Sequence, residues 1–500
     1  MSLRSKVFKS SIINVIDQVM KLVAVFFLTP LMVTELGDRY GLWLLLLTFV
    51  SYFSLLDLGV SFSAPRFISR AEGNQDLGER NLVVGICYRL FVRMSLIAAA
   101  ITLVAVLVVP IFANSAETRG VIRWVVAAFG FSFALRYYFR IYQVLLKSAL
   151  RYDLIVAASI TRVFVQTLVI YFLLSRGKGL VAIAIAQACC DILESLLFFV
   201  FARRLHPDLP IGEKVKNRNK SREILRYSLT FFGASSGLYM KGRVDPLLVG
   251  SLVGVAMVPI YSIGVRLLSI FNDLMDGLFG SHLMVAMSRV EGRDGPELLR
   301  ERLLESTKIS AVFTTFVGGS LAIFSGPFLT RWVGPQFADS YTVLLILIFP
   351  YVLFLSQYPS FSALHALAKN KFIMISAWAA ALFNLLLSVL LGVTIGFFGI
   401  IWATFIEMVL LYGFVFPWGV SRATGIPIGD YYATIAFNSL KTMIPLALFY
   451  LLARDLLLPD YGRLAMLAAL EIIIMGGWLW FFMLDPNQRK VARKQLFKGS

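Results

Sequence analysis

The chain has 500 residues, of which 58% are hydrophobic and 15% are charged, and its formal net charge is +18. A mean hydropathy of +0.78 is typical of a membrane protein and leaves no room for a soluble domain of useful size. Because a backbone in lipid must satisfy its hydrogen bonds internally, only helices or a closed barrel can span a membrane, and the long continuous apolar runs exclude a barrel.

Fourteen apolar spans are predicted in chain order from apolar length and polar breaks. The first six are predicted at 11–36, 41–65, 83–113, 121–147, 151–175 and 179–202. The next six are predicted at 224–251, 255–282, 305–332, 337–367, 371–396 and 397–421, and two more at 434–454 and 461–484. The sequence therefore predicts an all-α polytopic membrane protein with about 14 transmembrane helices.

A faint internal repeat relates the two groups of six spans. Gly37 and Gly254, like Pro110 and Pro327, lie 217 residues apart, and other landmarks recur in the same order. Six is an even number, so the second copy enters the membrane from the same side, which predicts two parallel lobes related by pseudo-two-fold symmetry. The predicted parts are an N-terminal lobe 1–202, a basic cytoplasmic linker 203–223, a C-terminal lobe 224–421, two further helices in 422–484, and a basic cytoplasmic tail 485–500.

The basic residues set the expected orientation, because Lys and Arg in short loops stay on the cytoplasmic side. The N-terminus, the linker and the tail carry most of them, so we expect both termini in the cytoplasm. Topology then explains the net charge, and no nucleic-acid partner is predicted. Contact of the linker and tail with anionic membrane lipids is compatible with this interpretation. The first span exceeds 20 residues and lacks a small-residue cleavage pattern, so we expect it to remain as a helix.

Cysteines and histidines give no sign of a cofactor. Cys87, Cys189 and Cys190 all fall in predicted spans, and the three histidines are scattered. We therefore predict no disulfide, no metal site and no cofactor.

Two stretches near the start, Leu36-Gly-Asp-Arg-Tyr-Gly-Leu-Trp43 and Leu55-Leu-Asp-Leu-Gly-Val60, resemble polysaccharide flippases of the multidrug/oligosaccharidyl-lipid/polysaccharide exporter superfamily. In the second half, Asp245-Pro-Leu-Leu-Val-Gly250 and Tyr261-Ser-Ile-Gly-Val-Arg266 are similar to that family's seventh and eighth helices. The resemblance implies two six-helix lobes around a cavity lined by the first, second, seventh and eighth helices. It also implies alternating access that carries a polyprenyl-pyrophosphate-linked oligosaccharide from the cytoplasmic to the outer leaflet.

The same resemblance implies a bacterial inner membrane protein of O-antigen, exopolysaccharide, lipopolysaccharide or capsule biosynthesis, with polysaccharide polymerase and chain-length machinery as partners. Two alternatives within the superfamily stay open, a lipid II flippase and a cation-coupled multidrug antiporter. An antiporter would be expected to concentrate unpaired carboxylates in its cavity. A membrane enzyme would need a sizeable extramembrane loop, whereas the longest predicted loops, 203–223 and 283–304, are short. We expect a transporter and no enzymatic activity.

A sugar and pyrophosphate headgroup needs cationic partners inside the membrane, so charges within the predicted spans are candidate site residues. Asp17 and Lys21 lie four residues apart, as do Lys241 and Asp245. Two interpretations of each pair stay open: the charges neutralise each other, or the pair makes a functional contact. Arg243 and Arg266 remain after this pairing, on helices that the resemblance places at the cavity. The predicted substrate-binding residues are Arg243, Arg266, Lys241 and Lys21.

The candidates for coupling or gating are Asp17, Asp57, Asp245 and Asp276. For Asp57 and Asp276, at repeat-equivalent ends of two spans, capping or gating is favoured over ion coupling. The remaining intramembrane charges include Arg136, Arg140 and Arg162, which we expect to meet Asp191 and Glu194 in a structural ion network rather than at a substrate. Glu407 and Glu471 are carboxylates for which proton carriage and a hydrogen-bonded structural role both stay open.

Overall fold

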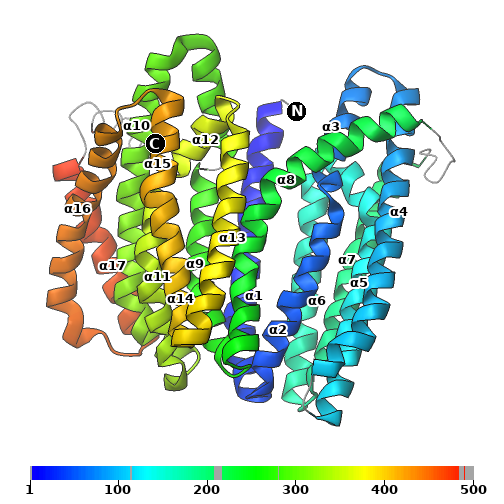
Figure 1. Ribbon diagram of the computed structural model, residues 1–500, viewed down its shortest axis with the longest axis horizontal. Coiled ribbons are helices and arrows are strands. Elements are labelled where there is room, and N and C mark those ends of the chain that lie inside the picture. The colour runs from blue at the N-terminus through cyan, green and yellow to red at the C-terminus, as the bar shows by residue number, and fades with distance from the viewer. Residues whose placement is uncertain (1–2, 113–114, 208–216, 280, 484–488, 490–500) are drawn as a thin grey trace. The chain divides into compact units, whose positions relative to one another are not determined.

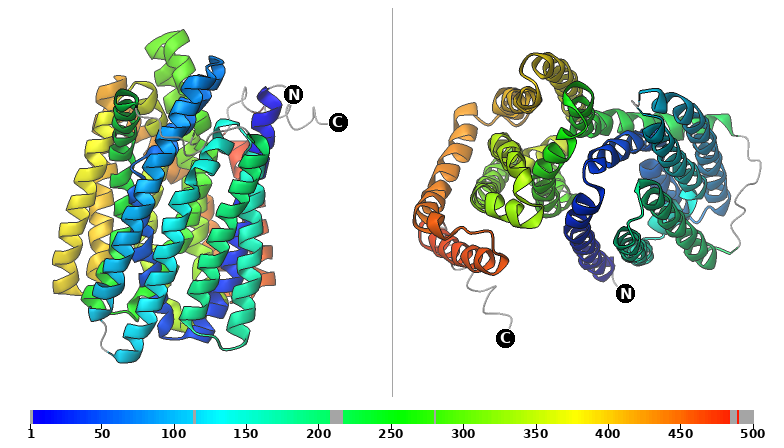
Figure 2. Two further views of the ribbon diagram at one scale, coloured as in Figure 1. Left: turned by 90° about the vertical axis from the view of Figure 1, so that its right-hand side faces the viewer. Right: turned by 90° about the horizontal axis from the view of Figure 1, so that it is seen from below.

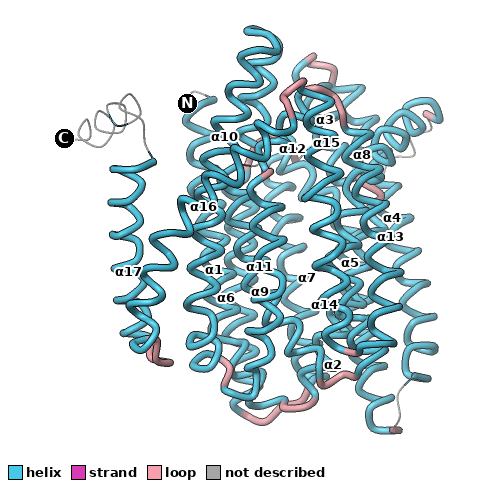
Figure 3. The backbone as a smooth tube through the Cα atoms, turned by 60° about the vertical axis from the view of Figure 1, so that its left-hand side comes forward, coloured by secondary structure: helices cyan, strands magenta, loops and turns pink. Residues whose placement is uncertain are grey.

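Every regular element that the computed structural model describes is a helix (Figure 1). The described residues are 3–112, 115–207, 217–279, 281–483 and 489. Loops are confined to the ends of helices (Figure 3). Within this part of the chain, 13 segments are long and apolar enough to cross a membrane. The prediction of an all-α polytopic membrane protein is confirmed.

The seventh predicted span, 224–251, corresponds to helix α8, Arg218–Leu248, which is not among the 13. It is helical along its length, but Arg226, Arg243 and Asp245 interrupt its apolar character. Hydropathy therefore underrates this helix, although the backbone of α8 is as regular as that of its neighbours.

Packing divides the chain into two compact units, Met1–Gly250 (unit 1) and Ser251–Ser500 (unit 2). Unit 1 includes α8, because this helix packs against α2 and α3. The internal repeat instead assigns residues 224–251 to the second predicted lobe. The two lobes describe the expected symmetry of the chain, not its packing, and stay a prediction.

Unit 1 is built around α5. This helix packs most extensively against α4 and α7, while α1 packs against α6, and the helices run side by side (Figure 2). Ile68, Phe91, Ile141 and Leu145 are fully buried in its core. The helices are α1 Leu3–Leu36, α2 Arg39–Ser51 with the 3₁₀ turn Tyr52–Asp57, α3 Val60–Gly73, α4 Leu77–Val108, α5 Ala116–Ser148, α6 Tyr152–Ser175, α7 Leu180–Leu205 and α8.

The beginning of α8 is fixed to the rest of unit 1 by polar contacts. The Asn217 side chain caps the helix by accepting from the Lys220 amide at 2.9 Å. The Lys220 Nζ atom lies 2.7 Å from Glu79 on α4, and this hydrogen bond raises the pKa of Lys220. About two turns further along α8, the buried hydroxyls of Ser63 on α3 and Ser228 on α8 share a short hydrogen bond. These contacts hold α8 along α3.

Unit 2 contains the remaining helices, among which α16 and α17 are adjacent (Figure 1). Its core includes the fully buried rings of Tyr431 and Phe416. The helices are α9 Met257–Phe279, α10 Ser281–Trp332, α11 Ala338–Ser356, α12 Tyr358–Ala366, α13 Asn370–Ile395, α14 Phe397–Leu410, α15 Phe416–Thr424, α16 Ile428–Ala453 and α17 Tyr461–Trp478.

The predicted loop 283–304 is wrong, because these residues belong to α10. This helix is kinked at Gly295, which has φ 85° and ψ −179°, and it continues on both sides of the kink. A hydropathy profile detects only apolar helices, so it cannot separate a polar helix from a loop. Likewise, the predicted span 337–367 divides at Gln357 into α11 and α12.

Candidate functional site

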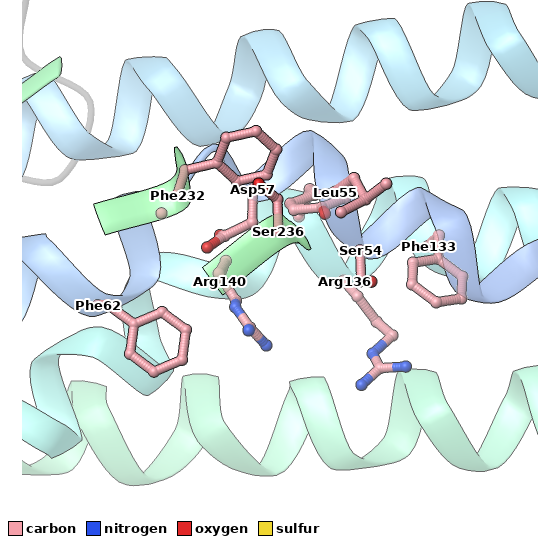
Figure 4. A pocket seen from close by; sticks show the side chains of 11 residues that line it. Ser54, Leu55, Asp57, Phe62, Phe133, Arg136, Arg140, Phe232 and Ser236 are labelled. Atoms are coloured by element: carbon pink, nitrogen blue, oxygen red, sulfur yellow. The ribbon is translucent and has the colours of Figure 1, made fainter. Parts of the chain in front are cut away.

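A cavity of about 390 Å³ opens within unit 1 between the 3₁₀ turn after α2 and helices α3, α5 and α8 (Figure 4). The guanidinium groups of Arg136 and Arg140 extend toward the same side of it, with the rings of Phe62 and Phe133 at its two ends. Its lining residues are Ser54, Leu55, Asp57, Gly59, Phe62, Phe133, Arg136, Tyr137, Arg140, Phe232 and Ser236. The cavity is thus apolar at its ends and cationic in the middle.

A break in the backbone shapes one wall. Leu58 and Gly59 both adopt left-handed conformations, with φ of 48° and 77°, and separate the 3₁₀ turn from α3. Gly59 is required for a second reason, since a Cβ atom there would lie 2.5 Å from the Ser228 carbonyl oxygen of α8. At the wall of the cavity, α8 therefore approaches the backbone at Gly59, which is also where the break between the 3₁₀ turn and α3 lies.

Asp57 occupies the end of α3 that this break exposes. Its carboxylate accepts from the Ser61 amide at 3.2 Å and from the Ser61 hydroxyl at 2.5 Å, which satisfies the helix N-terminus. The Ser61 Oγ atom in turn accepts from Nε of Arg140 on α5 at 2.8 Å. The predicted capping or gating role of Asp57 stays a prediction, but its contact with Ser61 helps to position Arg140, which lies 79 residues after Ser61.

The terminal nitrogens of Arg140 are available to a ligand. The Nε atom of Arg140 makes the hydrogen bond to Ser61, and the two terminal nitrogens of the guanidinium group extend into the cavity (Figure 4). Arg136 and Lys147 lie four residues before and seven residues after Arg140 on the same face of α5, within about 40° of one another. Lys147 stacks over the Phe62 ring at 5.9 Å. A cationic stripe (Arg136, Arg140 and Lys147) therefore runs along α5.

The predicted ion network forms from two of the three arginines. Arg136 and Arg162 approach the two carboxylate oxygens of Asp191 on α7 at 3.5 and 3.3 Å, and Arg162 also lies 3.6 Å from Glu194. Asp191 is buried, so its charge needs these partners. No ion pair joins Arg140 to this network among the described residues; its Nε atom donates to Ser61 instead.

The charges around the cavity do not cancel. The two positive charges of Arg136 and Arg162 are balanced by the two negative charges of Asp191 and Glu194. Among the described residues, the two positive charges of Arg140 and Lys147 have only the single negative charge of Asp57 near them, with which Lys147 interacts electrostatically. One positive charge is left over among these described groups. An excess cation in a half-buried cavity favours an anionic ligand.

Of the residue pairs predicted from four-residue spacing, one can be examined. Lys21 Nζ lies 2.6 Å from Asp17 Oδ2 on α1, so the two neutralise each other, and the Lys21 side chain is 46% exposed. The Lys241 side chain lies outside the described residues, so the other pair stays a prediction. Asp245 on α8 is buried and Arg243 is half-buried. Substrate or coupling roles for these residues remain predictions.

The other predicted residues belong to unit 2. Arg266 is exposed on α9, and Asp276 is exposed one turn before the end of the same helix. The Tyr358 hydroxyl donates to Asp276 at 3.4 Å. Arg243 belongs to unit 1 and Arg266 to unit 2, and a substrate-binding role for each stays a prediction. The cationic stripe was missed because Arg140 was grouped with the acids of α7, whereas its partner Ser61 carries no charge to signal the contact.

Comparison with known proteins gives a consistent assignment. A family described as polysaccharide biosynthesis protein matches residues 74–342. The uncharacterized membrane protein EpsK of Bacillus subtilis (strain 168) is 23% identical over 417 residues, which cover 80% of each protein.

Among solved structures, the lipid II flippase MurJ in an inward closed conformation matches with a TM-score of 0.73 at 15% identity, covering 95% of this chain and 98% of that one. An inward-facing multidrug resistance transporter of the MATE family in the MOP superfamily matches with a TM-score of 0.63 at 16% identity, covering 80% of this chain and 98% of that one. At such identities the likeness shows a common fold. The chain is thus a multi-pass membrane protein with the fold of MOP-superfamily transporters, and it belongs to the polysaccharide biosynthesis protein family.

Proposed function

We propose that this protein is a flippase that moves polyprenyl-pyrophosphate-linked oligosaccharide repeat units from the cytoplasmic to the outer leaflet, by alternating access, for O-antigen, exopolysaccharide or capsule synthesis. Membership of the polysaccharide biosynthesis family supports the pathway, and the transporter fold supports translocation over catalysis. The single observation that carries the proposal for the site is Arg140, which Ser61 anchors through Nε while its terminal nitrogens face the cavity.

The geometry suits a phosphate ligand. A guanidinium group binds two phosphate oxygens with its planar fork and keeps its charge at any physiological pH. Because the Asp57 and Ser61 contacts already hold Arg140, little side-chain entropy is lost when an anion binds. The cavity falls within the range of small-ligand sites, so it would hold part of the headgroup rather than the entire lipid-linked sugar.

The same proposal includes the setting of the protein. We place it in the bacterial inner membrane with both termini in the cytoplasm, on the distribution of Lys and Arg. Anionic lipids would contact the basic start of α8, where Arg66 also stacks on Tyr227 at 4.5 Å. A polysaccharide polymerase and chain-length machinery would receive the translocated substrate.

The test is deletion of the gene in the bacterium that carries it, followed by complementation. We expect lipid-linked oligosaccharide to accumulate while surface polysaccharide disappears, and we expect Arg140→Ala to fail to restore it. Loss of charge-assisted hydrogen bonds worth about 1.5–3 kcal/mol corresponds to a roughly 10- to 150-fold weaker affinity. The control is Arg176→Ala, which removes an exposed arginine stacked on Phe172 at 4.3 Å. Normal surface polysaccharide in the deletion strain would contradict the function, and full rescue by Arg140→Ala would contradict the site.

A lipid II flippase is the second candidate, favoured by the extent of the fold match to MurJ. Lipid II also carries a pyrophosphate, so the Arg140 site fits both substrates. Rescue of a strain depleted of its lipid II flippase would select this alternative. A cation-coupled antiporter is less consistent with the cavity, because Asp57 and Asp191 are both engaged by hydrogen bonds or arginines.

A further inference from the structure

A second cavity, of about 540 Å³, lies within unit 2 among α9, α10 and α17. Leucine, phenylalanine, alanine and other apolar side chains form nearly all of its wall. Glu471 of α17 is the single carboxylate among the residues that line it, and its side chain is 2% exposed. A carboxylate in such surroundings is costly, because desolvation disfavours the charge by several kcal/mol.

A serine hydroxyl on the neighbouring helix contacts the carboxyl group of Glu471. Ser320 Oγ on α10 lies 2.9 Å from Glu471 Oε2 and 2.9 Å from the Phe316 carbonyl oxygen. A serine hydroxyl has one proton to donate. When Ser320 donates to Phe316, a protonated Glu471 can donate to Ser320 in turn. A neutral carboxylic acid therefore gives each of the two contacts a proton of its own.

The surroundings of Glu471 offer no compensating charge. In the described part of unit 2, its Oε1 atom has no hydrogen-bond partner and no basic group forms an ion pair with it. On α10, Lys308 and Arg331 are 12 and 11 residues from Ser320, and Arg331 stacks over Tyr461 at 5.6 Å. On α16, Lys441 stacks over Phe437 at 4.1 Å. On α9, the cavity is lined by Leu267, while the neighbouring Arg266 is exposed.

The helix that carries Glu471 buries little of its surface against the rest of unit 2. The apolar window of α17 is 22% buried, the lowest share among the spans of unit 2 in the described chain. Gly476 and Gly477 follow within two turns with open space around their Cα atoms, and a π-helical turn, Leu479–Met483, comes next. Glycine pairs and π turns are established positions of helix bending. These features are points at which α17 can bend, beyond Glu471.

We propose that Glu471 is a proton-binding site and that release of its proton is linked to the separation of α17 from α10. With α17 against α10, the neutral acid donates to Ser320. When α17 moves away and water enters, the proton passes to water and a hydrated carboxylate remains. Since each form favours one arrangement of the helices, proton binding shifts the equilibrium between them. This inference goes beyond the proposed flippase and does not depend on which substrate is carried.

The first experiment is infrared difference spectroscopy of the purified full chain in phospholipid vesicles, which separates the carbonyl stretch of a carboxylic acid from that of a carboxylate. We expect an acid band at neutral pH that declines as the pH is raised, and that is missing from Glu471→Gln. The matched control is Glu407→Gln, which alters another buried carboxyl group and should leave the titrating band in place. Absence of the band at neutral pH, or a band that never titrates, would overturn the proposal.

Ser320→Ala provides a second variant that keeps the acid. We expect the band to change position because the acid loses its partner, and an unchanged band would overturn the assignment to Glu471.

The link between proton release and helix separation is tested with Ser325→Cys, at a buried position of the cavity, after replacement of Cys87, Cys189 and Cys190. The rate of maleimide labelling at this cysteine is divided by the rate for the same protein with Glu471→Gln, so that the pH-dependent ionisation of the thiol cancels. This ratio of labelling rates should rise over the pH range in which the acid band declines. A ratio that does not change with pH would overturn the linkage.

Discussion

The cavities of unit 1 and unit 2 solve the same physical problem in opposite ways. In unit 1, the buried carboxylate of Asp191 forms ion pairs with Arg136 and Arg162, which lie within 3.5 Å of it. In unit 2, Glu471 has no cation beside it, and a hydrogen bond with Ser320 is its sole polar contact among the described residues. The first carboxyl is therefore stabilised by ion pairing, whereas the second is stabilised by keeping its proton.

This difference separates two kinds of ligand. An ion network with one cation in excess presents a fixed charge, so the cavity of unit 1 is suited to a phosphate. A neutral acid in an apolar cavity presents a charge only after it loses a proton, so the cavity of unit 2 responds to protons and water. A carboxyl buried in a membrane protein is thus not interpretable without its partners.

The largest effect should come from making the same chemical change in both cavities. Asp191→Asn removes the charge that Arg136 and Arg162 share and leaves Arg162 with Glu194 alone. Because Asp191 is the buried partner, breaking these pairs should cost up to about 3–5 kcal/mol. Glu471→Gln replaces a neutral acid by a neutral amide and should cost within about 1 kcal/mol. The thermal unfolding midpoints of the two purified variants at neutral pH provide the measurement. Equal losses would remove the distinction between the cavities.

An intermediate effect is expected from adding a methyl group to glycines of the two units. Gly59→Ala places a Cβ atom 2.5 Å from the Ser228 carbonyl oxygen at a φ of 77°, and we expect a loss of about 1–3 kcal/mol. Gly476→Ala meets nothing within 4 Å in the helical α17 and should stabilise by about 0.4–1 kcal/mol. Thermal unfolding again reports the sign. A stabilising Gly59→Ala would show that α8 does not approach α3 as described.

The smallest effect concerns a titratable group outside the spans, where water is present. Burial lowers the pKa of His206, with Glu72 opposing and Arg80 reinforcing the shift. Its neutral form is favoured in the folded protein, so its contribution to stability is complete above the unfolded pKa of about 6.5 and is lost as the pH falls. His206→Gln should therefore reduce the drop in the unfolding midpoint between about pH 7.5 and 5.5. An unchanged pH dependence would contradict this assignment.

The positions of the spans were predictable from the sequence because apolar length is a direct requirement of the bilayer. The helical conformation of residues 283–304 could not be predicted in this way, because a hydropathy profile detects only apolar helices and this segment is polar. The Asp191 network followed from counting charges, but the Arg140 contact depends on an uncharged serine 79 residues away. The protonation of Glu471 depends similarly on Ser320, 151 residues distant. Contacts of neutral side chains across a fold leave no trace in charge or periodicity.

The central claim is that the protein translocates a pyrophosphate-linked oligosaccharide through a site containing Arg140. The most direct measurement uses the purified protein in vesicles that contain lipid-linked oligosaccharide and follows the sugar exposed to an impermeant reagent over time. The account predicts rapid transfer between leaflets with wild type and Arg176→Ala, and transfer slowed roughly 10-fold or more with Arg140→Ala at limiting substrate. Transfer at the protein-free rate with wild type would contradict the function, and equal rates for all three proteins would contradict the site.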